Sequence, residues 1–250
     1  MLKSKKHNTQ KDWLLAWEAQ KRFSNTEQGK LRAEHLIELA ISRIPRGKCV
    51  YTWSGGKDAI ALQCICERAG ITDCALGTIG FRWEYPSFVK YVNENKPDNL
   101  VIKDYGITAD FLNSNEHLLF PDNYKDVYYW MIHCNQRTFN EFLKETSADF
   151  VLCGHRRQDG NIVKDGIIKQ KVFPMYDFTH EDVFLIIGYC GKQLPEIYFY
   201  KDGFQNGTHT WLEREGGHVG MSELLQIDKN ILLENRNLNK INRFLKARNL

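Results

Sequence analysis

The stretch Cys49-Val50-Tyr51-Thr52-Trp53-Ser54-Gly55-Gly56-Lys57-Asp58 decides the fold, because it reads as a strand, a glycine turn and the start of a helix. Its first five residues form a short apolar and β-branched run, which is typical of a buried strand. The residues from Ala59 to Arg68 favour a helix by propensity, and Gly70 is placed to close that helix. The order predicts one βα unit of an α/β protein.

More helices and strands are expected on both sides of this unit. Apolar residues at three- and four-residue intervals predict helices over 12–23 and 27–44, and Pro45-Arg46-Gly47 ends the second. Downstream we expect strands at 74–79, 100–102 and 150–153, with helices at 87–94 and 129–145. This alternation predicts a doubly wound, mostly parallel sheet with helices on both faces. Ligands in such sheets bind where strands end, so the loops after Trp53, Ile79 and Cys153 should share one crevice.

The glycine turn has the composition of an anion cradle. Gly55 and Gly56 let the backbone point several N–H groups at one spot, where the dipole of the following helix adds positive partial charge. Lys57 adds a full charge, Ser54 a hydroxyl, and Asp58 is a candidate to carry Mg²⁺ or to orient the cradle. The alternative is a plain βα turn. The stretch matches neither G-x-x-x-x-G-K-[ST] nor G-x-G-x-x-G, which disfavours a dinucleotide-binding dehydrogenase.

Composition excludes several classes of protein. The 250 residues carry 34 Lys and Arg against 31 Asp and Glu, and a net charge of +3 does not by itself indicate nucleic acid. Both ends of the chain are basic, so they either flank an anionic partner or are solvated helix faces. Seven cysteines without paired C-x-x-C spacing fit a reducing cytoplasm rather than a disulfide framework. No apolar stretch approaches the roughly 18–20 residues that span a bilayer, so no membrane is expected.

Ser54 to Asp58 resemble the S-G-G-x-D-S signature of the PP-loop ATP pyrophosphatases, the adenine nucleotide α-hydrolase-like superfamily, with Ala59 at the final serine. Over roughly 46–212 the order of further motifs resembles the phosphoadenosine phosphosulfate reductase branch. Those motifs are Gly77-Thr78 with Glu84-Tyr85-Pro86-Ser87, where Gly77 replaces an aspartate, His133-Cys134 to Leu143-Lys144, Gly154-His155-Arg156-Arg157, and Pro174 to Val183 followed by Leu194-Pro195 and Tyr198.

The resemblance implies a site for ATP and Mg²⁺. Catalytic roles fall on Lys57, Asp58, Arg156 and Arg157, with Asp58 as the metal ligand. The implied nucleotide contacts are Trp53, Ser54, Gly55, Gly56, Lys57, Asp58, Thr78, Gly154 and His155. The implied reaction cleaves ATP between its α- and β-phosphates and adenylylates an acceptor.

The last cysteine is Cys190, so the C-terminal E-C-G-L-H segment of true sulfonucleotide reductases is missing. A reductase-like chain without that cysteine resembles the ATP pyrophosphatase subunits of DNA phosphorothioation systems. This resemblance implies DNA, a cysteine desulfurase and other modification subunits as partners, possibly with homo-oligomers. The alternatives are a sulfonucleotide reductase-like enzyme, an enzyme that thiolates tRNA, and a non-catalytic subunit that senses ATP.

Three parts of the chain are expected: an N-terminal helical extension over 1–45, the PP-loop nucleotide-binding domain over 46–200, and a C-terminal loop and helical tail over 201–250 packed on the same domain. Residues 205–221 form a candidate lid. Several residues also have purely structural interpretations. Trp53 is an adenine-stacking candidate but also a core candidate, Thr179 to Asp182 predict a helix-capping box, and Cys134 and Cys153 read more readily as small buried hydrophobes than as nucleophiles.

Overall fold

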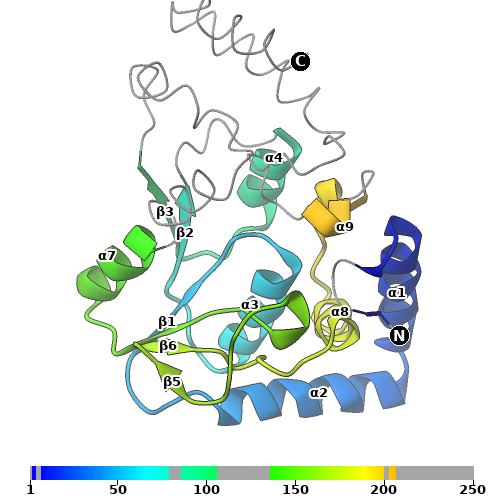
Figure 1. The fold of residues 1–250 in the computed structure, drawn as a ribbon, viewed down its shortest axis with the longest axis horizontal. Helices are drawn as coiled ribbons and strands as arrows, with labels where there is room; N and C mark the ends of the chain where they lie inside the picture. Colours follow the sequence, from blue (N-terminus) through cyan, green and yellow to red (C-terminus); the bar gives the residue numbers. More distant parts are fainter. Residues whose placement is uncertain (1, 4–6, 79–85, 106–135, 200–202, 207–250) are drawn as a thin grey trace, which may run out of the picture.

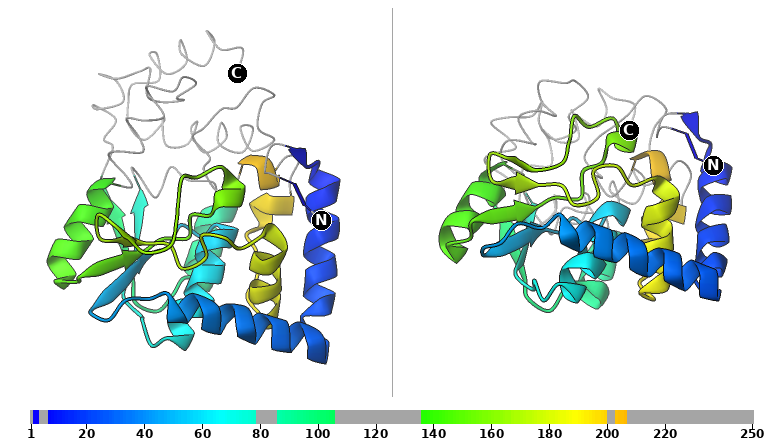
Figure 2. Two further views of the ribbon diagram at one scale, coloured as in Figure 1. Left: turned by 60° about the horizontal axis from the view of Figure 1, so that its bottom comes forward. Right: turned by 90° about the horizontal axis from the view of Figure 1, so that it is seen from below.

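The computed structural model describes residues 2–3, 7–78, 86–105, 136–199 and 203–206 (Figures 1 and 2). Within these ranges the strands form one six-stranded sheet in the order β3-β2-β1-β4-β6-β5. The strands are β1 Cys49–Thr52, β2 Cys74–Thr78, β3 Leu100–Asp104, β4 Phe150–Leu152, β5 Ile167–Ile168 and β6 Lys171–Val172.

The topology has a switch point beside β1. This strand is parallel to β2 on one side and to β4 on the other, so the chain runs outward to β3 and then returns across the centre. β6 is also parallel to β4, and only the edge strand β5 runs antiparallel within the described sheet. The predicted doubly wound, mostly parallel sheet is confirmed. The loops after β1 and β4 therefore emerge side by side, which is where such sheets bind ligands.

Successive strand residues face opposite layers of helices, as the two-residue period of a strand requires. Val50 and Val151 pack on the side of α7 Arg137–Thr146, whereas Tyr51 and Leu152 face the other side. That other side is covered by α3 Lys57–Arg68, α4 Pro86–Asn95 and α8 His180–Tyr189. Figure 2 shows α7 and these helices on opposite sides of the sheet.

The two N-terminal helices, α1 Gln10–Phe23 and α2 Glu27–Ser42, pack against α8. Trp13 of α1 is fully buried and belongs to the same apolar core as Tyr51 of the central strand. The N-terminal segment thus shares the hydrophobic core of the sheet. Capping boxes start α1 at Thr9 and α8 at Thr179, the second as the sequence predicts.

The hairpin of β5 and β6 was not predicted. Lys169 and Gln170 connect the two strands with φ of +48° and +64°, which is the backbone of a tight two-residue hairpin turn. Asn and Gly usually mark such turns, and this turn contains neither.

The remaining short elements are the 3₁₀ turns η5 Arg157–Asp159 and η6 Glu196–Phe199, and α9 Gly203–Asn206. The motif at 133–134, most of the predicted loop after Ile79, the candidate lid and the C-terminal tail lie outside the described residues. Among the described helices, none combines the length and apolarity needed to cross a bilayer.

Candidate functional site

The glycine turn lies at the carboxyl end of β1, and α3 begins directly after it. Gly55 has a φ of +65°, and a Cβ atom there would lie 2.8 Å from the ring of Phe88, so both conformation and space require glycine. Gly56 is the N-cap of α3 and offers no side chain to the first helical amides. Because these amides have no acceptor within the helix, the turn presents backbone donors suited to an anion.

The loop after β4 lies against this turn. A Cβ atom on Gly154 would approach the carbonyl oxygen of Asp58 to 3.0 Å, so this glycine permits the close contact of the two loops. The same loop continues into Arg156 and Asp159, whose side chains reach the start of α3. The shared crevice predicted for the loops after β1 and β4 is therefore observed.

Arg156 is the centre of a buried polar network. Its side chain is fully buried, and its Nε donates to Oδ1 of Asp58 at 2.9 Å. One terminal nitrogen lies 2.9 Å from Oδ2 of Asp159, and the other donates to the carbonyl of Phe178 at 3.0 Å. A buried guanidinium is stable only with such partners, so Arg156 holds the two loops and the segment before α8 together.

Lys57 belongs to the same network. The residue is 3% exposed, and its Nζ lies 2.7 Å from Oδ2 of Asp58 and 3.5 Å from Oδ1 of Asp159. The long contact to Asp159 is the weaker of the two. As placed, the ammonium group serves the carboxylates first, and a phosphate must compete for it.

Asp58 is a carboxylate held by cations. Burial raises its pKa, but the charges of Arg156 and Lys57 outweigh burial and lower the pKa below its usual value. Arg156 contacts Oδ1 and Lys57 contacts both oxygens, so no oxygen of Asp58 is left without a cationic neighbour. This arrangement fits the orienting role predicted for Asp58 and does not fit the predicted role as a Mg²⁺ ligand.

The described residues also contain no group of three or more His, Cys, Asp and Glu side chains arranged to hold a metal ion.

The network is close to electrically neutral. Two cations, Lys57 and Arg156, face two carboxylates, Asp58 and Asp159. His180 adds no charge, because Arg156 has only N–H donors and lies 2.9 Å from His180 Nδ1, which must therefore act as an acceptor. The backbone amides and the surrounding loops, rather than surplus side-chain charge in the network, carry the attraction for an anion.

The two adjacent arginines have different environments. Arg157 is exposed, its Nε donates to the carbonyl of Val163 at 2.9 Å, and its guanidinium lies 4.9 Å from the centre of the Tyr176 ring. His155 is exposed as well and contacts Phe173 edge to face. Arg156 therefore supports the cradle, whereas Arg157 and His155 are open to a second ligand.

Trp53 lies in the core. The residue is 1% exposed, its Nε1 donates to Gln63 at 2.8 Å, and its ring stacks on Tyr91. The adenine-stacking role predicted for Trp53 is thus not supported, and the alternative core role fits the packing. Ser54 is exposed at the turn, and Thr78 is buried at the end of β2, at the same edge of the sheet.

Three members of the site were not predicted as functional residues: Asp159, His180 and Tyr198. Asp159 follows Arg156 by three residues on the loop after β4, which is the one local signal for it. His180 was read as part of the capping box, and that box exists, but its ring also meets Arg156. Tyr198 was quoted in a motif without a role.

Cys153 is fully surrounded at the end of β4. Burial raises the pKa of its thiol to about 11, so the reactive thiolate is scarce at neutral pH. The interpretation of Cys153 as a small buried hydrophobe agrees with this environment, whereas Cys134 lies outside the described residues.

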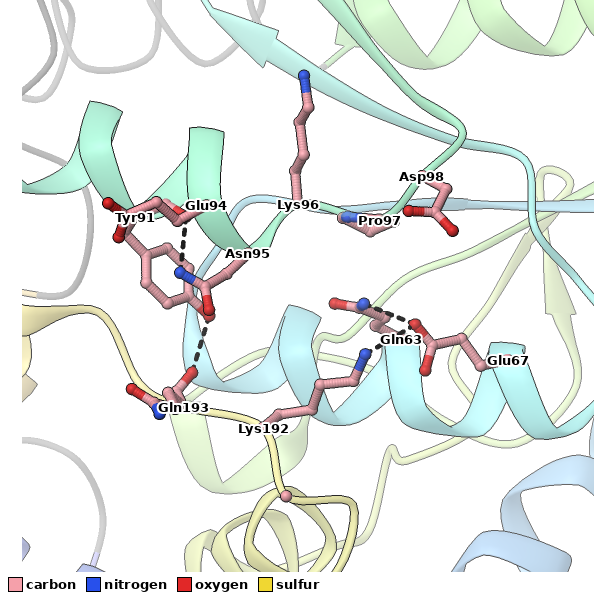
Figure 3. A pocket seen from close by; sticks show the side chains of 11 residues that line it. Gln63, Glu67, Tyr91, Glu94, Asn95, Lys96, Pro97, Asp98, Lys192 and Gln193 are labelled. Carbon is pink, nitrogen blue, oxygen red and sulfur yellow. Dashed lines mark hydrogen bonds and ion pairs between the residues drawn. The ribbon is translucent and has the colours of Figure 1, made fainter.

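A cavity of about 360 Å³ opens between α3, α4 and the segment after α8 (Figure 3). None of the predicted site residues lines it. It borders Gln63 and Tyr91, the two side chains that hold Trp53 in place. The cavity is therefore separate from the cradle, although both share the support of Trp53.

Fold and site together define an α/β protein with an anion-binding turn at the switch point of a parallel sheet. No protein-family model matches the sequence, and no curated protein matches it. Two solved structures are similar in fold. A phosphoadenylyl-sulfate (PAPS) reductase from Candida auris, in a phosphate complex, has a TM-score of 0.46 and 15% identity, covering 66% of this chain and 82% of its own. The U34-tRNA thiolase NcsA from Methanococcus maripaludis, with its [4Fe-4S] cluster, has a TM-score of 0.48 and 13% identity, covering 87% of this chain and 80% of its own. We base the proposals below on the residues of this chain.

Proposed function

We propose that this protein binds ATP at the glycine turn and cleaves it between the α- and β-phosphates, transferring the adenylyl group to an acceptor that then receives sulfur. The observation that supports this most directly is the backbone of the turn. Gly55 in the left-handed region, followed by the uncapped N-terminus of α3 at the switch point of the sheet, suits the terminal phosphates of a nucleotide.

In the proposed step, an oxygen of the acceptor attacks the α-phosphorus, and the bond from that phosphorus to the bridging oxygen breaks. Pyrophosphate leaves with the electron pair, and the proton of the acceptor passes to solvent. Negative charge grows on the pyrophosphate, which the amides of the turn are placed to stabilise. Lys57 contributes by exchanging its long contact with Asp159 for a phosphate oxygen. Because Asp58 does not fit a metal-ligand role, we route no step through Mg²⁺.

The acceptor proposed is nucleic acid: DNA in a phosphorothioation system first, and tRNA as the alternative. Arg157 supports a phosphate-bearing acceptor, because its exposed guanidinium lies one residue from the cradle network and stacks on Tyr176. A cysteine desulfurase is the proposed source of sulfur, and a cytoplasmic location follows from that partnership.

The buried and raised-pKa Cys153 gives no support to the sulfonucleotide reductase alternative. A second function is supported by the neutral network: a subunit that binds ATP without cleaving it, since Lys57 and Arg156 are already paired with carboxylates.

Pyrophosphate release from ATP, measured with and without DNA or tRNA, tests these functions. The Lys57→Ala plus Asp58→Ala variant is expected to lose the release, and Lys30→Ala, an exposed lysine paired within α2, is the control expected to retain it. Equal release by all three proteins would contradict catalysis at this turn. Tight ATP binding without release of pyrophosphate would select the sensing function.

A further inference from the structure

Tyr198 makes a hydrogen bond that connects a distant segment to the cradle. Its hydroxyl oxygen accepts from the backbone N–H of Lys57 at 2.9 Å, although 141 residues separate the two positions. Lys57 is the first residue of α3, so this amide is one of those that the helix itself cannot satisfy. The N-cap residue, Gly56, has no side chain for this purpose. Tyr198 therefore supplies the cap that the glycine turn lacks.

The position of Tyr198 is fixed by the two ends of the chain. Gln10 of α1 donates from Nε2 to the carbonyl of Tyr198 at 2.7 Å, and its Oε1 accepts from the amide of Phe204 in α9. The rings of Tyr198 and Phe204 pack 4.8 Å apart, and Trp13 of α1 stacks on Phe204 at 5.4 Å. An aromatic cluster from α1, η6 and α9 thus holds the hydroxyl in place behind the turn, and Figure 1 shows α9 near α1 and α8.

The hydroxyl stays protonated in this setting. Burial raises the pKa of Tyr198, and the nearby carboxylate of Asp58 raises it further. A protonated hydroxyl is neutral, so its oxygen can accept from Lys57 without adding negative charge beside an anion site.

We propose that Tyr198 is a positioning residue of the cradle, which fixes the first amide of α3 so that the remaining amides of the turn are aimed at a phosphate before it arrives. The inference rests on the proposed nucleotide function of the turn. Preorganised donors lose less entropy when a ligand binds, and this is the contribution that Tyr198 makes. The N-terminal helix α1 consequently supports nucleotide binding, through Gln10 and Trp13, in addition to packing on α8.

The test compares Tyr198→Phe with Tyr189→Phe. Tyr189 is a matched control, because its hydroxyl makes one hydrogen bond, to Glu34, and it sits at the end of α8 away from the turn. Inorganic pyrophosphate and ATP are the ligands, and calorimetry gives their Kd. Tyr198→Phe should weaken both about fivefold, the effect of one hydrogen bond, while Tyr189→Phe leaves them unchanged. Amide hydrogen exchange of Lys57 should quicken only in Tyr198→Phe.

The outcomes separate the two ideas. If the natural chain binds pyrophosphate and both variants bind it equally well, Tyr198 does not position the cradle. Tighter binding by Tyr198→Phe would also overturn the inference, since the hydroxyl would then compete with the ligand for the amide. If the natural chain binds neither ligand, the proposed function fails, and unchanged exchange at Lys57 would separately remove the capping role. Denaturation of both variants in urea shows whether loss of stability alone explains a weaker Kd.

Discussion

Nε of Arg156 lies 2.9 Å from Oδ1 of Asp58, across the switch point of the sheet and 98 residues away in the chain. This pair joins the loop after β4 to the first turn of α3, so the shape of the glycine turn depends on a buried charge. Removing one partner of such a pair leaves the other charge buried and uncompensated, which costs more than the pair itself contributes.

Replacing Arg156 by Met should therefore lower the free energy of unfolding by about 3 kcal/mol or more, because Asp58 and Asp159 would repel each other without it. Arg32→Ala is the control, since Arg32 forms a half-exposed pair with Asp182 and should cost at most about 1 kcal/mol. Urea denaturation measures both values. Similar losses for the two variants would mean that Arg156 does not hold the loops together.

Acid should weaken the fold through Asp58. Its pKa is lowered in the folded chain, where Arg156 and Lys57 outweigh the effect of burial. The stabilisation is complete above the unfolded value, about 3.9, and is lost as pH falls toward the lower folded value. Unfolding measured from pH 7 down to pH 3 should show a decline that is shallower in Asp58→Asn. Parallel curves for the two proteins would contradict the assigned shift.

Asp159→Asn should increase the affinity for pyrophosphate. The substitution removes one negative charge from a nearly neutral network and frees Lys57 from its 3.5 Å contact. A several-fold decrease in Kd is expected at low salt, with a smaller effect at high salt because ions screen the charge. Asp177→Asn, a carboxylate paired with Arg43 away from the turn, is the control. Weaker binding by Asp159→Asn would show that the carboxylate itself contacts the ligand or a metal.

Cysteine labelling should distinguish Cys190 from Cys153. A hydrogen bond from Cys64 lowers the pKa of Cys190, which is only partly buried, whereas burial raises that of Cys153 to about 11. Iodoacetamide at neutral pH should modify Cys190 first in the folded protein, and both equally in urea. Mass spectrometry of the peptides gives the order. Early modification of Cys153 would reopen a role for it in sulfur chemistry.

The local features of the site were predictable from sequence, whereas its long-range pairings were not. Gly55 and Gly56 between a β-branched run and a helical run indicate the turn directly, and strand alternation indicates the parallel sheet. Sequence gave no sign that Lys57 and Arg156 would be paired with Asp58 and Asp159, because those partners come from distant loops.

The two arginines illustrate the limit of local patterns. Arg156 has an extended backbone, with φ −131° and ψ 156°, and neighbours on extended backbone point to opposite sides. This periodicity indicates that Arg156 and Arg157 diverge. Which of them turns inward depends on Asp58, and that contact follows only from the folded sheet.

Arg157 should affect the acceptor and not the nucleotide. Its guanidinium is exposed and held against Tyr176, so replacing it by Ala removes one phosphate contact while the cradle network around Arg156 stays intact. Binding of DNA or tRNA should weaken, and the slope of log K against log salt should fall by about one. Arg137→Ala is a matched control, because Arg137 is also an exposed arginine stacked on a tyrosine, Tyr105, but lies on α7. Equal effects of the two variants would mean that binding depends on overall charge rather than on a surface beside the turn, and a loss of ATP affinity in Arg157→Ala would place this arginine in the nucleotide site instead.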